Sequence, residues 1–318
     1  MNLAFLACVE AGNLENQAGL LVRSIRKYAG DLRDAPVHLF RPRPGQPLRE
    51  ETIALCAALA VELHEEPLNL EYGYYPISNK IFCGAWAEAN LTENILVFAD
   101  SDTVFLNPPE KLLLEEKFLA AVRPVNRKNR GSAGPGDPRD PYWEALYRLC
   151  GVHQRPYVET VVDRAPVRGY WNAGLVAVRR SAGLFGQWLE DFRTLMRAAH
   201  FPPPRKVLNN MDQLSLAATL ARMSDALAPL DFRYNYPLPL RADLPAGPRE
   251  ARLEELVHAH YYRWFNTPGF LESLQPPLDP AGEAFVWLRS FLPFKPTLDP
   301  SDDHRKSPLL PEGLEKTE

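Results

Sequence analysis

Two carboxylates separated by one residue follow a continuous hydrophobic run in the first half of the sequence. Ile95–Ala99 predicts a buried strand, and Asp100, Ser101 and Asp102 follow it directly. A strand that ends in this way places both acids at the carboxyl edge of an α/β sheet, where such folds bind ligands. Because two close carboxylates repel each other, a divalent cation bound to phosphate is a common way to neutralise them. The alternative is an ordinary turn, since Asp and Ser also start turns.

A lysine lies in the first turn of a predicted helix, a position that favours negative charge. Ser78 is expected to cap a helix that contains Ile81 and Phe82, so Lys80 falls in its first turn. A cation there opposes the helix dipole, whereas phosphate is attracted by the dipole and by the free backbone N–H groups. We therefore predict a phosphate contact for Lys80, with a solvated surface lysine as the alternative.

Two further segments carry polar side chains that could contact a sugar. Asn172, Ala173 and Gly174 precede a predicted strand, and the small residues would let the backbone approach a ligand while the amide bonds hydroxyls. Asp212 and Gln213 fall in the first turn of a predicted helix, where the acid also suits the dipole. Each segment also fits a simpler interpretation, a turn before a strand or a capped helix start.

Two histidines share one face of a late predicted strand, residues 255–262, because side chains alternate along a strand. One imidazole beside two carboxylates makes a mixed nitrogen and oxygen site suited to Mn²⁺. His260 lies nearer the end of the strand and is preferred over His258, although spacing alone does not choose between them. A packed, hydrogen-bonded histidine is the alternative for either residue.

The elements that would position these residues alternate between short hydrophobic runs and helical patterns, which is typical of an α/β sheet. Strands are predicted at 3–8, 37–40, 61–63, 95–99, 118–122 and 174–178. Residues 123–141 are rich in Arg, Gly, Pro and Asp and predict a long loop or flap. We expect one domain, residues 1–292, followed by a Pro-rich, charged and disordered tail, residues 293–318.

Composition limits the possible partners of the chain. It has 318 residues, of which 46% are hydrophobic and 24% charged, a globular composition. A net charge of −4 argues against nucleic acid or a membrane surface as partner. No hydrophobic run approaches the roughly 18 residues of a transmembrane segment, and residues 3–8 lack the basic start of a signal peptide. The four cysteines form no CxxC pair, which favours reduced thiols in a cytoplasmic protein.

The number, order and spacing of these motifs resemble the glycogenin-like and lipopolysaccharide-galactosyltransferase-like nucleotide-sugar glycosyltransferases of the GT-A fold, over residues 1–265. The resemblance implies a Rossmann-like, mostly parallel central sheet flanked by helices in one large domain. It also implies transfer of a hexose from a nucleoside-diphosphate sugar, a UDP-sugar in particular, to an acceptor hydroxyl, with Mn²⁺ or Mg²⁺ as cofactor. The acceptor could be a glycan, a lipid-linked sugar, a protein or a small molecule.

The resemblance further implies roles for single residues. The end of the first strand would border the nucleotide base, and the lysine would lie near the diphosphate. The donor-binding set is Val9, Glu10, Ala11, Lys80, Asp100, Ser101, Asn172, Ala173, Gly174 and Arg263. Asp100, Asp102 and one of His258 and His260 would bind the metal, and Asp212 and Gln213 would act at the reacting centre.

The chain departs from the family pattern at two places. An acidic residue that usually follows the strand at 118–122 is replaced by a stretch that begins with Arg123, so the donor sugar is not implied. The usual Lys-Pro-Trp after the histidine is also replaced, and Arg263 is expected to supply the missing cation. If the sugar configuration is retained, Asp212 or Gln213 would support the cationic carbon. If it is inverted, Asp212 would be the general base.

Two other functions fit parts of the sequence. Asp100 could be the nucleophile of a haloacid-dehalogenase-like phosphohydrolase, although that family places its motif on the first strand. A non-catalytic sugar-nucleotide-binding protein would bind the nucleotide without turnover. Release of phosphate from a generic phosphomonoester separates the first alternative from a glycosyltransferase.

Overall fold

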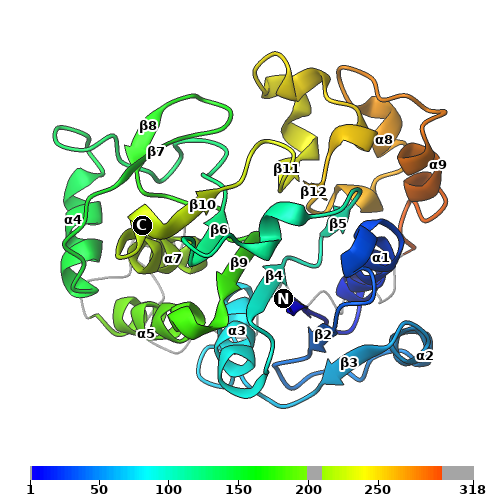
Figure 1. Ribbon diagram of the computed structural model, residues 1–318, viewed down its shortest axis with the longest axis horizontal. Coiled ribbons are helices and arrows are strands. Elements are labelled where there is room, and N and C mark those ends of the chain that lie inside the picture. Colours follow the sequence, from blue (N-terminus) through cyan, green and yellow to red (C-terminus); the bar gives the residue numbers. More distant parts are fainter. Residues whose placement is uncertain (1, 199–209, 296–318) are drawn as a thin grey trace.

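The computed structural model describes residues 2–198 and 210–295. At its centre lies a seven-stranded sheet with the strand order β10-β6-β9-β4-β1-β2-β3 (Figure 1). The strands are β1 (Leu3–Cys8), β2 (Val37–Phe40), β3 (Val61–His64), β4 (Ile95–Ala99), β6 (Ala120–Val122), β9 (Leu175–Arg179) and β10 (Leu227–Pro229). Every neighbouring pair is parallel except the two that involve β9. The expected α/β architecture, a mostly parallel sheet flanked by helices, is confirmed.

Side chains of each strand alternate between two hydrophobic cores. Ala4 and Leu6 of β1 face a core built with helices α3 (Asn79–Asn90), α4 (Asp140–Leu149), α5 (Leu184–Arg197) and α7 (Met211–Ala221). Leu3 and Phe5 face the opposite core, built with α1 (Asn13–Tyr28) and α2 (Glu50–Ala58). Because both faces of the sheet are covered, its strands read as continuous hydrophobic runs.

A smaller three-stranded sheet extends the fold beyond the carboxyl end of β4. It has the order β11-β12-β5, with β11 (Tyr236–Pro237), β12 (His258–His260) and β5 (Thr103–Phe105). Helices α8 (Phe270–Ser273) and α9 (Glu283–Arg289) pack on it through a third hydrophobic core. Strand β12 is shorter than the predicted 255–262, because a 3₁₀ turn ends at Glu255 and Tyr262 has a φ of 54°.

Residues at the start of the predicted tail, 293–318, make contacts with the domain. Phe294 is buried in the third core, and the side chain of Asn16 donates a hydrogen bond to the carbonyl of Lys295. Phe294 and Lys295 therefore contact the domain, within the segment that was predicted as a tail. Most of the predicted tail, residues 296–318, lies outside the described residues.

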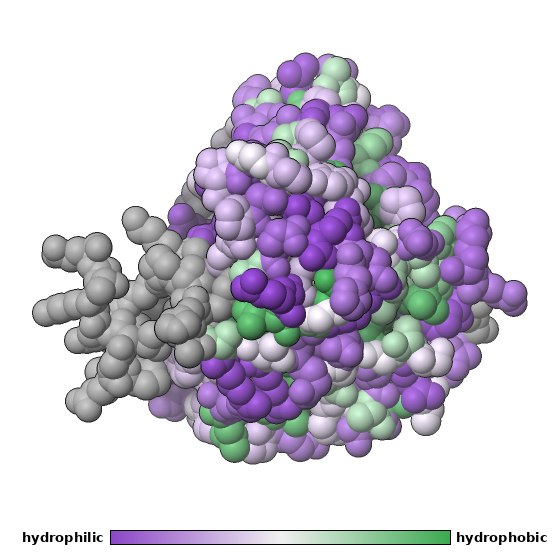
Figure 2. Space-filling model, turned by 90° about the vertical axis from the view of Figure 1, so that its left-hand side faces the viewer, coloured by the Kyte–Doolittle hydropathy of each residue, from purple (hydrophilic) through white to green (hydrophobic). Residues whose placement is uncertain are grey.

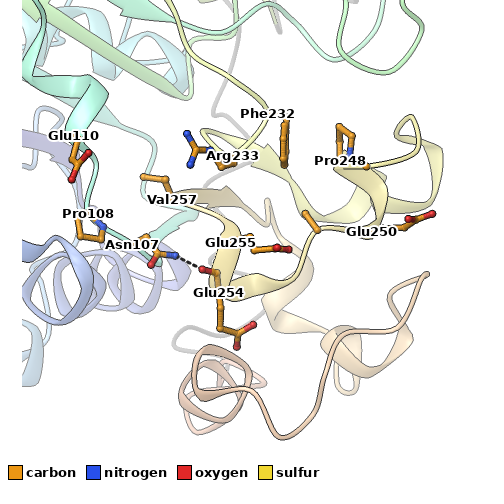
Figure 3. A pocket seen from close by; sticks show the side chains of 12 residues that line it. Asn107, Pro108, Glu110, Phe232, Arg233, Pro248, Glu250, Glu254, Glu255 and Val257 are labelled. Carbon is orange, nitrogen blue, oxygen red and sulfur yellow. Dashed lines mark hydrogen bonds between the residues drawn. The ribbon is translucent and has the colours of Figure 1, made fainter.

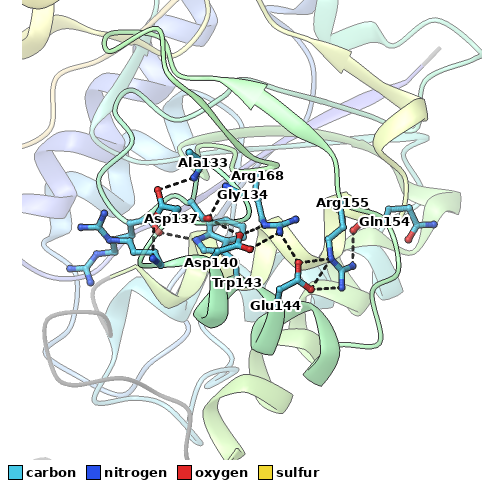
Figure 4. A network of polar contacts seen from close by, with 12 residues as sticks. Ala133, Gly134, Asp137, Asp140, Trp143, Glu144, Gln154, Arg155 and Arg168 are labelled. Atoms are coloured by element: carbon cyan, nitrogen blue, oxygen red, sulfur yellow. Dashed lines mark hydrogen bonds and ion pairs between the residues drawn. The ribbon is translucent and has the colours of Figure 1, made fainter.

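The segment predicted as a long loop or flap is anchored by ion pairs (Figure 4). Asp140, at the start of α4, accepts two hydrogen bonds from Arg168, at 2.5 and 2.9 Å, and one from Ser132, at 2.7 Å. Arg168 ends the hairpin of β7 (Tyr157–Glu159) and β8 (Pro166–Arg168). These contacts hold the loop, the hairpin and α4 together as one unit.

The molecular surface on the side of α4 and the hairpin is mostly hydrophilic, with hydrophobic residues in small groups (Figure 2). Across the described residues, no helix has the length and hydrophobicity needed to cross a membrane. The cysteines Cys8, Cys56, Cys83 and Cys150 are free, so none forms a disulfide.

Candidate active site

The predicted site residues meet at one edge of the central sheet because of its strand directions. β1 and β4 are parallel, so their carboxyl ends, followed by Val9 and Asp100, lie at the same edge. β9 is antiparallel to β4, so its beginning lies at that edge too. The backbone N–H of Asp100 accordingly donates to the carbonyl of Gly174 at 2.9 Å. Chain segments far apart in sequence therefore build one site.

A possible metal-binding group consists of Asp100, Asp102 and His260, whose ligand atoms lie within 4.8 Å of one another. His260 Nε2 is 3.1 Å from Asp102 Oδ1. Burial raises the pKa of Asp102, but His260 and Lys80 outweigh this effect, so the pKa stays below its usual range and the carboxylate is charged. Two carboxylates and one imidazole are a donor set that suits Mn²⁺ and, through the oxygens, Mg²⁺.

His258 does not belong to this group. It precedes His260 by two residues, and a strand rises about 3.3 Å per residue, which moves its ring back along β12 away from the acids. There it packs against Phe105, with ring centroids 4.6 Å apart, and is completely buried. The structure thus places His260, not His258, beside the carboxylates.

Asn235 orients the imidazole of His260, and the sequence analysis missed it. Its Oδ1 lies 3.1 Å from His260 Nδ1, and its Nδ2 donates to Asn172 Oδ1 at 2.8 Å. If Nδ1 carries the proton, Nε2 faces Asp102 with its lone pair free for a metal. Asn235 has a φ of 49°, a conformation that Asn adopts more readily than most residues. Its position between Tyr234 and Tyr236 gave no sequence signal for this role.

Lys80 is a buried cation between two predicted site acids. Its Nζ lies 2.6 Å from Asp100 Oδ1 and 3.5 Å from Asp212 Oδ2. Burial lowers the pKa of Lys80, but the two carboxylates outweigh burial and raise it above its usual value. With 8% of its surface exposed, Lys80 is not the solvated surface lysine of the alternative interpretation.

The helix start at α3 differs from the prediction. Ser78 has helical backbone angles and makes no side-chain cap; its hydroxyl donates instead to the carbonyl of Tyr75 at 2.7 Å. The reason is a 3₁₀ turn, Pro76–Ser78, that leads directly into α3. Lys80 nevertheless lies in the first turn of α3, as predicted.

Asp212 and Gln213 lie in the first turn of α7, and Asp212 joins this group of charges through its Oδ2, 3.5 Å from Lys80 Nζ. Asp212 is 3% exposed, and burial raises its pKa to about 6, although Lys80 acts in the opposite direction. Among the described residues, neither Asp212 Oδ1 nor Gln213 Oε1 has a hydrogen-bond partner, although both atoms are buried. Buried acceptors without partners are costly unless a ligand satisfies them.

The turn before β9 brings backbone close to the metal-binding group. Asn172 Oδ1 accepts from the N–H of Gly174 at 2.8 Å, in addition to the bond from Asn235. This leaves the Nδ2 group of Asn172 for a ligand. A Cβ on Gly174 would lie 2.9 Å from the ring of His260, closer than real side chains pack. The small residue is therefore required by this close approach.

A second region of the site lies beyond β1. Glu10 and Ala11 line a pocket of about 380 Å³, together with Arg43 and Tyr74. Arg43 donates to both carboxylate oxygens of Glu10, at 2.6 and 2.5 Å. This pocket adjoins the end of β1, where the resemblance implies the nucleotide base.

Two residues of the predicted donor-binding set, Ser101 and Arg263, have surroundings that the prediction does not imply. The hydroxyl of Ser101 donates to the carbonyl of Cys8 and so ties the end of β4 to the end of β1. Arg263 is exposed and forms no ion pair with any residue that the structure describes, so the structure does not bring it to the carboxylates. Arg263 follows Tyr262, whose φ of 54° ends the extended backbone of β12.

A larger open pocket, of about 750 Å³, lies away from these residues (Figure 3). Its lining includes Glu110, Arg233, Glu250, Glu254 and Glu255. None of the predicted site residues borders it, so the sheet edge stays the candidate active site.

Comparison with known proteins gives the class of the chain. The family model described as the Rhodobacterales glycosyltransferase domain matches residues 5–224, so the chain belongs to this glycosyltransferase family. Membership confirms the expected glycosyltransferase class and contradicts the phosphohydrolase alternative. No curated protein matches the sequence.

Several solved structures are similar to this one. Mouse xyloside xylosyltransferase 1 has 12% sequence identity and a TM-score of 0.46, with 82% of this chain and 96% of that chain covered. The galactosyltransferase LgtC, solved with donor and acceptor sugar analogues, has 12% identity and a TM-score of 0.48, with 92% of this chain and 96% of that chain covered.

Proposed function

We propose that the protein transfers a hexose from a nucleoside-diphosphate sugar, a UDP-sugar in particular, to an acceptor hydroxyl, and that the reaction depends on Mn²⁺ or Mg²⁺. The observation that carries this proposal is the convergence of two carboxylates, one imidazole, one lysine and a second buried acid at one sheet edge. These residues are Asp100, Asp102, His260, Lys80 and Asp212.

The residues would divide the chemistry as follows. Asp100, Asp102 and His260 would hold the divalent cation, which would offset negative charge on the diphosphate as the sugar–phosphate bond breaks. Lys80 supplies a fixed positive charge at the same place, and this charge stabilises the leaving group more as negative charge develops on it. Its two carboxylate partners hold the ammonium in position before the substrate binds.

Asp212 could serve a reaction that retains the configuration of the sugar or one that inverts it. Its Oδ2 lies 3.5 Å from Lys80 Nζ, whereas its Oδ1 has no protein partner among the described residues, so Oδ1 can approach a positively charged sugar carbon when the carboxyl is ionised. Its pKa of about 6 also suits a general base that takes the proton of the acceptor hydroxyl near neutral pH. The retaining and inverting courses remain separate predictions, distinguished by the anomeric configuration of the product.

The amide turn and the β1 pocket would hold the rest of the donor. The Nδ2 group of Asn172 would donate to a sugar hydroxyl, and Gly174 would allow the sugar to lie against the backbone. Val9, Glu10 and Ala11 would border the base beside Arg43. The assignment of one domain, residues 1–292, and the cytoplasmic location inferred from the cysteines stay predictions.

The test is release of nucleoside diphosphate from a panel of UDP-sugars, with Mn²⁺, with Mg²⁺ and with a chelator. We expect metal-dependent turnover of at least one donor, and a loss of about 100-fold or more in Asp102→Asn. Asp34→Asn is the control, because this acid is exposed and precedes β2, at the edge of the sheet opposite to the site. Tight nucleotide binding without turnover under all conditions would favour the non-catalytic alternative instead.

A further inference from the structure

A second group of metal-ligand side chains lies on the central sheet, apart from the active site. It consists of His38 on β2 and of Glu62 and His64 on the neighbouring strand β3. His38 is the register partner of Glu62, and His64 follows two residues later on the same face. The ligand atoms of all three side chains lie within 4.8 Å of one another.

Two separations in this group are close to those of a tetrahedral metal site. His38 Nδ1 is 3.0 Å from His64 Nε2 and 3.5 Å from Glu62 Oε2. Zinc bonds of about 2.0–2.2 Å to nitrogen and oxygen place tetrahedral ligands about 3.3–3.5 Å apart. Small side-chain rotations therefore suffice to admit the ion.

His38 has no other polar partner that explains its burial. Its side chain is 2% exposed, and its Nε2 has no hydrogen-bond partner among the described residues. The other residues of β2 (Val37, Leu39 and Phe40) are hydrophobic and buried. Since burial of an imidazole is unfavourable unless it is paired, this position is expected to carry a hydrophobic residue unless the ring has a function.

The surroundings of His64 match those of a metal ligand. Its ring is fixed by stacking on Phe40, with centroids 4.6 Å apart, and by Trp86 at 4.8 Å. Its second nitrogen, Nδ1, lies 4.0 Å from Glu66 Oε2. A metal-bound histidine usually donates a hydrogen bond from its second nitrogen to such a group. At 4.0 Å Glu66 does not accept one, but among the described residues its carboxylate is the nearest acid on that side of the ring that forms an ion pair with it. Glu62 is 67% exposed, so an ion can enter from solvent.

We propose that His38, Glu62 and His64 form a zinc-binding site, with water as the fourth ligand. Two imidazoles and one carboxylate with an open position are a donor set that zinc takes up in proteins. The site would join β3, the last strand of the sheet order, to β2 through their side chains. Zinc would therefore stabilise the sheet at this edge, because an ion that binds only the folded chain shifts the folding equilibrium.

The test uses the full-length protein with Asp100→Asn and Asp102→Asn, which removes the carboxylate ligands of the active site. After equilibration with Zn²⁺ and dialysis, we expect one zinc per chain by elemental analysis and a higher melting temperature than after chelation. Co²⁺ in place of zinc is expected to give the intense visible absorption of a tetrahedral complex.

Two further substitutions in this background show which residues hold the ion. His64→Gln is expected to weaken zinc binding 100-fold or more. Glu62→Gln changes a side chain that is 67% exposed, and is expected to weaken binding at least 10-fold. Glu65→Gln, at an exposed neighbouring acid paired with Arg41, is the matched control and should leave binding unchanged.

The proposal is overturned if the parent of these variants retains no zinc, or if Glu62→Gln and His64→Gln bind zinc as tightly as the parent does. The contact between the two imidazoles would then be only an N–H···N hydrogen bond. Both outcomes are independent of glycosyltransferase activity, since neither measurement requires turnover.

Discussion

Replacement of Asp212 by Asn should stabilise the protein while it removes activity. The pKa of Asp212 is raised from 3.8 to about 6 in the folded chain, mainly by burial. The folded state therefore favours the protonated form, and ionisation of this carboxyl destabilises the fold. That cost is small below about pH 4, grows as the pH rises, and is complete above about pH 6.

The magnitude follows from the difference between the folded and unfolded pKa values. A shift of about two units corresponds to about 3 kcal/mol at pH 7.5, and to about half of that at pH 5. Asn carries no charge at either pH, so Asp212→Asn should be more stable than the parent by these amounts. For a chain of this length, 3 kcal/mol raises the melting temperature by about 5 °C.

The assay is thermal unfolding at pH 5 and pH 7.5 in a chelating buffer, together with donor turnover. Asp137→Asn is the opposite control, because hydrogen bonds from Lys128 and from backbone N–H groups hold the pKa of Asp137 below its usual range. This variant should lose stability at pH 7.5. An Asp212→Asn variant that is less stable than the parent at pH 7.5, or whose advantage is equal at both pH values, would refute the reasoning.

Three other substitutions test the site and its support. Asn235→Ala should weaken Mn²⁺ binding 10- to 100-fold, because His260 loses the partner that orients it; unchanged affinity in a Mn²⁺ titration would contradict this role. Lys80→Gln should lower donor turnover about 100-fold, because the leaving diphosphate loses a fixed positive charge; kinetics at saturating metal would show it. Arg168→Met should lower the free energy of unfolding by about 3 kcal/mol, because Asp140 is left as a buried charge without its partner. Urea denaturation measures that loss, and a change below 1 kcal/mol would argue against it.

The fold was predictable because its strands are continuous hydrophobic runs. Ile95–Ala99 is a strand in both the prediction and the structure. A short, continuous hydrophobic segment that is followed by acids is typical of a buried strand. The start of α3 was harder. The prediction that Ser78 caps this helix was wrong. The 3₁₀ turn Pro76–Ser78 leads directly into α3, so Ser78 already has helical backbone angles.

The candidate site was predictable where its residues lie directly next to a strand or helix end. Asp100 follows a strand, and Lys80 and Asp212 lie in the first turns of helices. In an α/β sheet the carboxyl ends of strands and the starts of the helices that follow them lie at the same edge. Period-two alternation could not decide between His258 and His260, which share a face. Asn235 was not predictable, because its role depends on contacts with residues distant in sequence. Sequence spacing does not contain that information.

Assembly of the site has a consequence for the time at which the protein becomes active during synthesis. Glu10 follows the first strand of the central sheet, whereas His260 lies on β12, which is synthesised after all seven strands of that sheet. A nascent chain that has already formed β1 and β4 therefore lacks an intact metal-binding group. On the proposed function, an unfinished polypeptide would not cleave the sugar donor, and a truncation before β12 should abolish turnover even when most of the central sheet is present.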